Sequence, residues 1–116
     1  MGQRVDKRDW ADAQFAPDNR LGIAVPSLSL PWERMSGSER IAVLEAWESI
    51  RGTIPDRIFE FERRIRELQD ALFEEEDFVR SCRLNAAIAE LASRINDLNI
   101  WYRTEQDFEV ETRLHS

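Results

Sequence analysis

One cysteine and one histidine are the residues of this chain with the widest chemical range. Cys82 lies beside Arg83 and near Arg80, and nearby cations favour a reactive thiolate. The sequence places no histidine, lysine or second cysteine close to it to act as a base, and His115 is the penultimate residue of an acidic segment. We therefore interpret Cys82 as a small packed residue, and we expect no catalytic residue and no enzyme.

The acidic and basic residues suggest three further kinds of site. Glu74–Asp77 could hold a divalent cation, but the run lacks the alternating ligands and the glycine of a calcium loop. Glu60 with Glu90, or Glu45 with Glu67, could form a carboxylate pair, but a di-iron bundle also needs Glu-x-x-His motifs. Five arginines could line a dicarboxylate pocket, although no grouping stands out: Arg40, Arg51, Arg57, Arg80 and Arg94. We expect no metal site and no cofactor.

Composition and charge exclude several classes of protein. The chain has 116 residues, of which 42% are hydrophobic and 34% charged, with a net charge of −7. This balance is typical of one small folded domain. The negative charge disfavours nucleic-acid binding, and no apolar stretch approaches the roughly 18 residues of a membrane-spanning helix. Because no apolar signal-peptide core follows the first residues, we expect a cytoplasmic protein.

Two series of apolar residues, each with steps of 4, 3, 4, 3 and 4, predict two long helices. We call the twelve residues the seam: Ile54, Ile58, Phe61, Ile65, Leu68 and Leu72, then Leu84, Ile88, Leu91, Ile95, Leu98 and Tyr102. The 12 residues from Leu72 to Leu84 rotate the apolar direction by about 120°, so one straight helix cannot present both series on one face. We predict an antiparallel hairpin of helices 54–75 and 78–104, with Asp77 as an N-cap. A single kinked helix of about 50 residues that dimerises is the alternative.

The rest of the chain completes an all-α fold in which a long, coiled-coil-like antiparallel helical hairpin carries a shorter N-terminal helix and an extended N-terminal arm. Ser36 predicts the start of the shorter helix, over 38–51, and Gly52 predicts its end because glycine tolerates a positive φ. Residues 1–35 form the arm, mostly irregular, with alternating apolar residues from Leu21 onward that favour an extended segment lying across the helices. Residues 36–104 form a three-helix domain, and 105–116 form a frayed acidic tail.

The predicted turn reads Glu76-Asp77-Phe78-Val79-Arg80-Ser81-Cys82-Arg83-Leu84. It resembles the UVR motif, a helical hairpin of bacterial excision-repair and some Clp-associated proteins, over residues 64–98. The matching positions are Asp77-Phe78 for its acidic-aromatic turn, Ser81 and Cys82 for its small pair, and Leu84 and Ile88 for its apolar residues. The sequence departs from the motif at Val79 and at Asn85-Ala86, where the family has charges. The resemblance implies an accessory module that binds proteins in DNA repair or stress proteolysis.

Residues outside the seam indicate an interface. Phe59 and Phe73 lie off the seam, and a row of small residues opposite the second series would let another helix approach closely: Cys82, Ala86, Ala89 and Ser93. Either the arm or a second copy of the chain could cover them. We expect a homodimer, and hence a non-catalytic, self-associating protein–protein interaction module, with an unknown further partner possible. A UVR-like accessory module and a small all-helical enzyme with an arginine-lined pocket are the alternatives.

Overall fold

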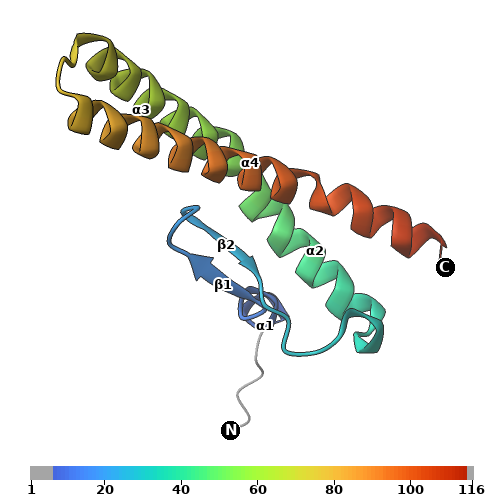
Figure 1. The fold of residues 1–116 in the computed structure, drawn as a ribbon. Helices are drawn as coiled ribbons and strands as arrows, with labels where there is room; N and C mark the ends of the chain where they lie inside the picture. Colours follow the sequence, from blue (N-terminus) through green and yellow to red (C-terminus); the bar gives the residue numbers. More distant parts are fainter. Residues whose placement is uncertain (1–6, 115–116) are drawn as a thin grey trace, which may run out of the picture.

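Figure 1 shows the computed structural model of the chain, which describes the backbone of residues 7–114 and the side chains of residues 7–104. Helix α2 (Gly37–Arg51) confirms the shorter helix, and it begins at the predicted cap. The Glu39 N–H donates to Ser36 Oγ over 3.1 Å, and the Ser36 N–H donates to Glu39 Oε1 over 2.8 Å. This reciprocal pair satisfies two backbone donors that a helix start otherwise leaves unpaired.

The junction between α2 and α3 (Ile54–Glu74) corrects one expectation. Gly52 has φ −61°, so the helix does not end through a left-handed glycine. Thr53 is also in the right-handed helical region, and the chain bends rather than turns. The break comes from Pro55, because proline has no N–H to donate to the Arg51 carbonyl and its ring crowds that group. Pro55 lies in the first turn of α3, where a missing donor costs least.

The predicted antiparallel hairpin is confirmed. Helix α3 packs along α4 (Phe78–Leu114), and the chain reverses at residues 75–77. The Arg80 N–H donates to Asp77 Oδ2 over 3.0 Å, as expected for an N-cap. Helix α4 continues to Leu114, so it includes most of the segment 105–116 that the sequence predicted to be a frayed tail. No glycine or proline follows Pro55 to stop the helix. The side chains of 105–116, His115 included, lie outside the described residues.

The arm is more regular than the sequence indicated. It contains α1 (Lys7–Asp12), two antiparallel strands, β1 (Phe15–Asp18) and β2 (Ile23–Pro26), and a short 3-10 helix (Trp32–Arg34). Phe15 pairs with Pro26 and Asp18 with Ile23. The Asp18 carboxylate accepts from the N–H groups of Arg20 and Leu21 within the turn. Gly22 has φ +73°, a left-handed conformation that favours glycine, and the Arg57 side chain of α3 lies against it.

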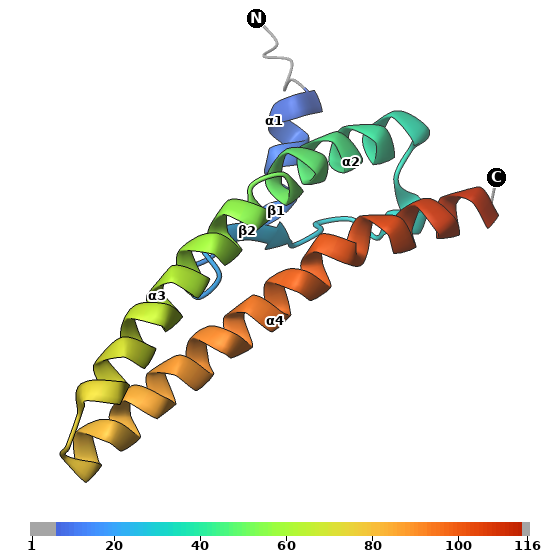
Figure 2. The same cartoon turned by 90° about the horizontal axis from the view of Figure 1, so that it is seen from above.

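The buried core lies at one end of an elongated molecule with extents of 65 × 39 × 20 Å. One cluster joins the arm, α2 and the base of the hairpin, and the other joins α1 to α2. The first contains Leu21, Ile23, Trp47, Ile54 and Leu98. The second contains Ala11, Met35 and Val43. We call α1, the two strands and α2 the head. In Figures 1 and 2, the strands lie on one side of the hairpin near its base, and the tip extends away from them.

Candidate functional site

The structure does not bring the five candidate arginines together. Arg40 donates to the Trp32 and Glu33 carbonyls, Arg57 pairs with Glu60, and Arg94 pairs with Glu90. Arg51 pairs with Glu48 and lies over the Tyr102 ring, 4.8 Å from its centroid, while Arg80 lies exposed near the hairpin tip. Among the described residues, no group of three or more histidine, cysteine or acidic side chains could hold a metal ion.

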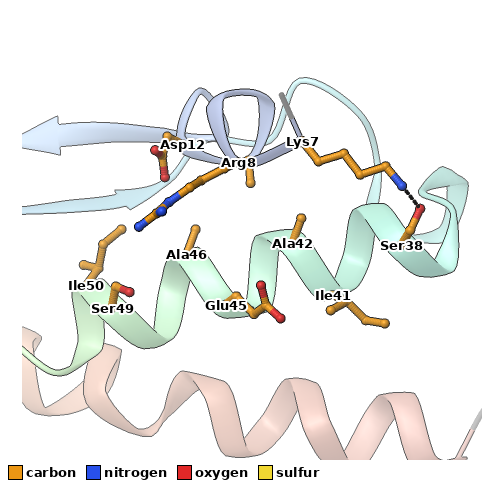
Figure 3. Close-up of a pocket in the computed structure, with 11 residues that line it drawn as sticks. Lys7, Arg8, Asp12, Ser38, Ile41, Ala42, Glu45, Ala46, Ser49 and Ile50 are labelled. Atoms are coloured by element: carbon orange, nitrogen blue, oxygen red, sulfur yellow. Dashed lines mark hydrogen bonds between the residues drawn. The ribbon is translucent and has the colours of Figure 1, made fainter. Parts of the chain in front are cut away.

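A groove of about 610 Å³ is lined by residues of α1 and α2. Figure 3 shows Lys7 and Arg8 of α1 above α2, with Lys7 Nζ donating to Ser38 Oγ over 2.8 Å. Glu45 and Ile41 also line the groove, but both point away from α1 (Figure 3). The cations and the Glu45 carboxylate therefore do not converge on one point where a substrate could react.

The twelve seam residues fall into two groups. Ile54 and Leu98 are buried, because the arm and Trp47 of α2 cover them. Nine others are only half-buried, and Tyr102 is exposed. Ile58 and Phe61 contact the buried cluster at its edge. The head thus covers the base of the hairpin, and the remaining length is a pair of helices with no third layer in the described part of the chain.

Arg20 attaches the turn between the strands to α4, a contact that the sequence analysis missed. Its guanidinium donates to Glu90, Asp97 and the Ser93 hydroxyl. Asn19 and Gly22 in a four-residue link between two apolar stretches are a hairpin signal, and they could have indicated the turn that positions Arg20. Ser93, one of the predicted interface residues, is therefore bound within the chain.

The Arg20 contact gives a pH-dependent prediction. Hydrogen bonds from Arg20, and next from Arg94, lower the pKa of Glu90. A carboxyl whose pKa is lowered by folding stabilises the fold above its unfolded pKa of about 4.3, and this contribution disappears as the pH falls through the lowered folded value. We expect Arg20→Ala to melt at a lower temperature than the parent at neutral pH, with the gap closing in acid. Thermal melts by circular dichroism at both pH values test this. A gap that persists in acid would contradict the assignment.

The predicted interface residues lie at different positions around the hairpin. Phe59 and Phe73 are 66% and 89% exposed. Cys82 and Ala89 are exposed on one side of α4, whereas Ala86, also exposed, lies seven residues before Ser93 and shares the side that Arg20 binds. The head contacts the opposite side of both helices, since Arg57 lies against Gly22 and Arg20 binds Glu90. Positions seven residues apart share a side of a helix, so Phe59 and Phe73, 14 residues apart, lie on the same side of α3, away from the head.

We call the side of the hairpin that faces away from the head the free face. Figure 2 shows α3 and α4, the two helices that form it. It comprises Phe59, Arg66 and Phe73 of α3 with Cys82, Asn85, Ala89, Ala92, Asn96 and Asn99 of α4. Near the hairpin base a groove of about 350 Å³ runs between the helices, and Phe59, Asn99 and Tyr102 are among the residues that line it. The free face carries the exposed rings of Phe59 and Phe73 on the side away from the head, and it is our candidate site.

Cys82 lies exposed on the free face, near the start of α4. We expect Cys82→Ala to change the free energy of unfolding by less than about 1.5 kcal/mol, because the swap keeps a small side chain. We also expect the thiol to alkylate at the rate of an ordinary free cysteine, as no histidine, lysine or second cysteine is close to it in the sequence. Urea denaturation and a timed thiol-labelling assay test both points. A thiol that labels far faster would indicate a reactive site.

None of the helices in the described residues combines the length and apolarity needed to cross a membrane. No protein-family model matches the chain, and neither a curated protein nor a solved structure shows a significant similarity to it, so the evidence on function is the geometry of the free face.

Proposed function

We propose that this chain is a non-catalytic protein–protein interaction module that associates with a second copy of itself through the α3–α4 hairpin. The observation that carries the proposal is the incomplete burial of the seam. Between Ile54 and Leu98, none of residues 55–97 is buried. Two helices alone bury only one stripe each, and helical bundles reach a closed core by adding further helices.

The exposed aromatic residues support the same function. Phe59, Phe73 and Phe78 are all more than 60% exposed, and all three lie on the hairpin. Aromatic residues are enriched at protein–protein interfaces relative to the rest of a protein's surface. Self-association is the form of interaction that needs no further component, and a two-fold dimer uses one patch on both copies.

A second candidate function is the binding of a different protein by the hairpin tip, as the UVR-like turn implies. The specific observation that favours it is the pairing of Phe78 and Val79, 80% and 55% exposed, with the acidic run Glu74–Asp77. An acidic apolar tip suits a partner with a basic rim around an apolar groove. We further propose a cytoplasmic setting, because reducing compartments keep exposed thiols such as Cys82 unpaired.

Sedimentation velocity of the full chain at low micromolar concentration tests self-association. We expect a species of twice the 13.6 kDa chain mass, and a concentration-dependent return to monomer on dilution. A strict 13.6 kDa monomer across the concentration range would overturn self-association and leave binding of a different protein as the remaining candidate.

A further inference from the structure

The side of α4 that belongs to the free face has no charged residue from Cys82 to Asn99. Its six members recur with steps of 3, 4, 3, 4 and 3: Cys82, Asn85, Ala89, Ala92, Asn96 and Asn99. All six are exposed, in a chain of which 34% is charged. Exposed helix faces usually carry charges, so this composition is typical of a surface that another helix covers.

The order of these residues is nearly the same in both directions. Read from either end, the four central positions give asparagine, alanine, alanine and asparagine. Two antiparallel copies of α4 would therefore place Ala89 opposite the partner's Ala92 and Asn85 opposite the partner's Asn96. The alanines permit close approach, and asparagine amides both donate and accept hydrogen bonds. The two-fold axis of this arrangement passes between Ala89 and Ala92.

Helix α3 gives the same axis independently. Phe59 and Phe73 lie 14 residues apart, and the position midway between them is Arg66. Arg94 lies over the Phe61 ring, 5.8 Å from its centroid, which shows the relative level of the two helices. Arg66 is five residues after Phe61 on α3. Because the two helices are antiparallel, the position at the same level on α4 is five residues before Arg94, which is Ala89. The phenylalanine pair of α3 and the asparagine–alanine row of α4 thus have their midpoints at about the same level of the hairpin.

We propose that a second copy of this chain docks on the free face with its tip pointing the opposite way, so that α3 packs on the partner's α3 and α4 on the partner's α4. This inference rests on the proposed self-association and specifies its surface and direction. Phe73, 89% exposed near the tip, then lies at the level of the partner's Phe59. Phe59 lines the groove of about 350 Å³ at the hairpin base. Each copy therefore has a projecting Phe73 ring and a groove that can hold the Phe73 ring of the other copy.

Charge distinguishes this arrangement from one with the tips together. The tip carries the acidic run Glu74–Asp77. A dimer with parallel hairpins would place two such runs side by side, and like charges repel. The opposite direction places each acidic tip at the level of the partner's hairpin base, where Arg103 is exposed. The antiparallel pairing therefore keeps the acidic tips apart, and the two exposed Arg66 side chains that meet at its axis are long enough to turn their guanidinium groups into solvent.

The free face also reaches the minimum area of a specific interface. From Pro55 to Phe73 the helix rises about 27 Å, and two adjacent helices span about 20 Å. These dimensions give about 540 Å² per copy, or about 1,100 Å² in total, near the lower bound of about 1,000 Å² for specific interfaces. Ile58 and Tyr102 line the groove on this side of the hairpin. Ile65 and Ile95 lie seven residues from them and are half-buried, so they add apolar surface on the same side.

The first test is a charge placed on the projecting ring. We expect Phe73→Asp to weaken self-association by roughly 30-fold or more, the effect of losing an aromatic contact that fills a groove of the partner and of placing a charge there. Ile41→Asp is the matched control, because Ile41 is 58% exposed but lies on α2. It should dimerise like the parent in sedimentation velocity. Far-ultraviolet circular dichroism should show unchanged helix content in both variants, since both positions are exposed.

The second test locates the axis by cross-linking. In a Cys82→Ser background, Arg66→Cys places a thiol beside the axis, and we expect a short bis-maleimide to link two copies efficiently. Arg64→Cys is the matched control, since Arg64 lies on the same helix but on the side of Arg57, seven residues earlier. It should give no covalent dimer. The proposed docking surface would be wrong if the Phe73→Asp variant still formed the dimer. It would also be wrong if Arg64→Cys gave the covalent dimer and Arg66→Cys did not. Either result would leave self-association itself unaffected. A monomeric parent would overturn both.

Discussion

Replacing Trp47 by alanine should lower the free energy of unfolding by about 3–5 kcal/mol, a large part of the 5–15 kcal/mol that holds a typical domain together. Trp47 is 2% exposed and joins three parts of the chain. Its ring stacks on Phe15 of the arm at 6.1 Å between centroids and meets Trp101 of α4 edge-on at 5.8 Å. Urea denaturation followed by circular dichroism measures the loss.

Trp47→Phe is the control for this prediction. The buried Trp47 Nε1 has no hydrogen-bond partner among the described residues, and an unpaired buried donor costs free energy. Phenylalanine removes that donor and keeps an aromatic ring in contact with Phe15 and Trp101. We expect a loss below about 1.5 kcal/mol. If phenylalanine costs as much as alanine, the ring contacts are not the source of the stability.

Replacing Leu98 by alanine should cost about 2–5 kcal/mol, because Leu98 is fully buried and its removal leaves a cavity in the largest cluster. Leu91→Ala, one heptad earlier on α4, is the matched control. Leu91 is only half-buried and belongs to neither buried cluster, so its truncation should cost clearly less. Parallel urea titrations give both values. Equal losses would show that the distal seam is as well covered as the base.

The hairpin could be predicted from the sequence because its signals are local. The heptad steps fix which side of each helix is apolar, and Asp77 and Pro55 set where the helices begin. The end of α2 was predicted for the wrong reason, since Gly52 is right-handed and Pro55 causes the break. Proline removes the helical hydrogen bond to the carbonyl four residues before it, here that of Arg51. Gly52 lies between the two residues, so the sequence alone makes the glycine look like the cause of the helix end.

The arm and the candidate site were less predictable. The strands are short, Pro17 and Pro26 lie within them, and their pairing depends on the turn at Asp18 and Gly22. The sequence pattern placed Ser93 in one predicted interface row with Cys82 and Ala89. In the structure the Ser93 hydroxyl instead accepts a hydrogen bond from Arg20, in the turn between the strands. Which side of a hairpin stays uncovered depends on where distant segments pack, and helical periodicity alone does not contain that information.

The burial of all core residues at one end has a consequence for the dynamics of the chain. Local opening of a protein starts where few apolar contacts hold the backbone, and amide hydrogens exchange with solvent at those places first. In an isolated copy the backbone between Ile65 and Leu91 should exchange fast, while the amides around Ile54 and Leu98 remain protected. The hairpin tip is then the part of the fold that opens and recloses most often, and a bound partner would slow that motion along the whole length of both helices.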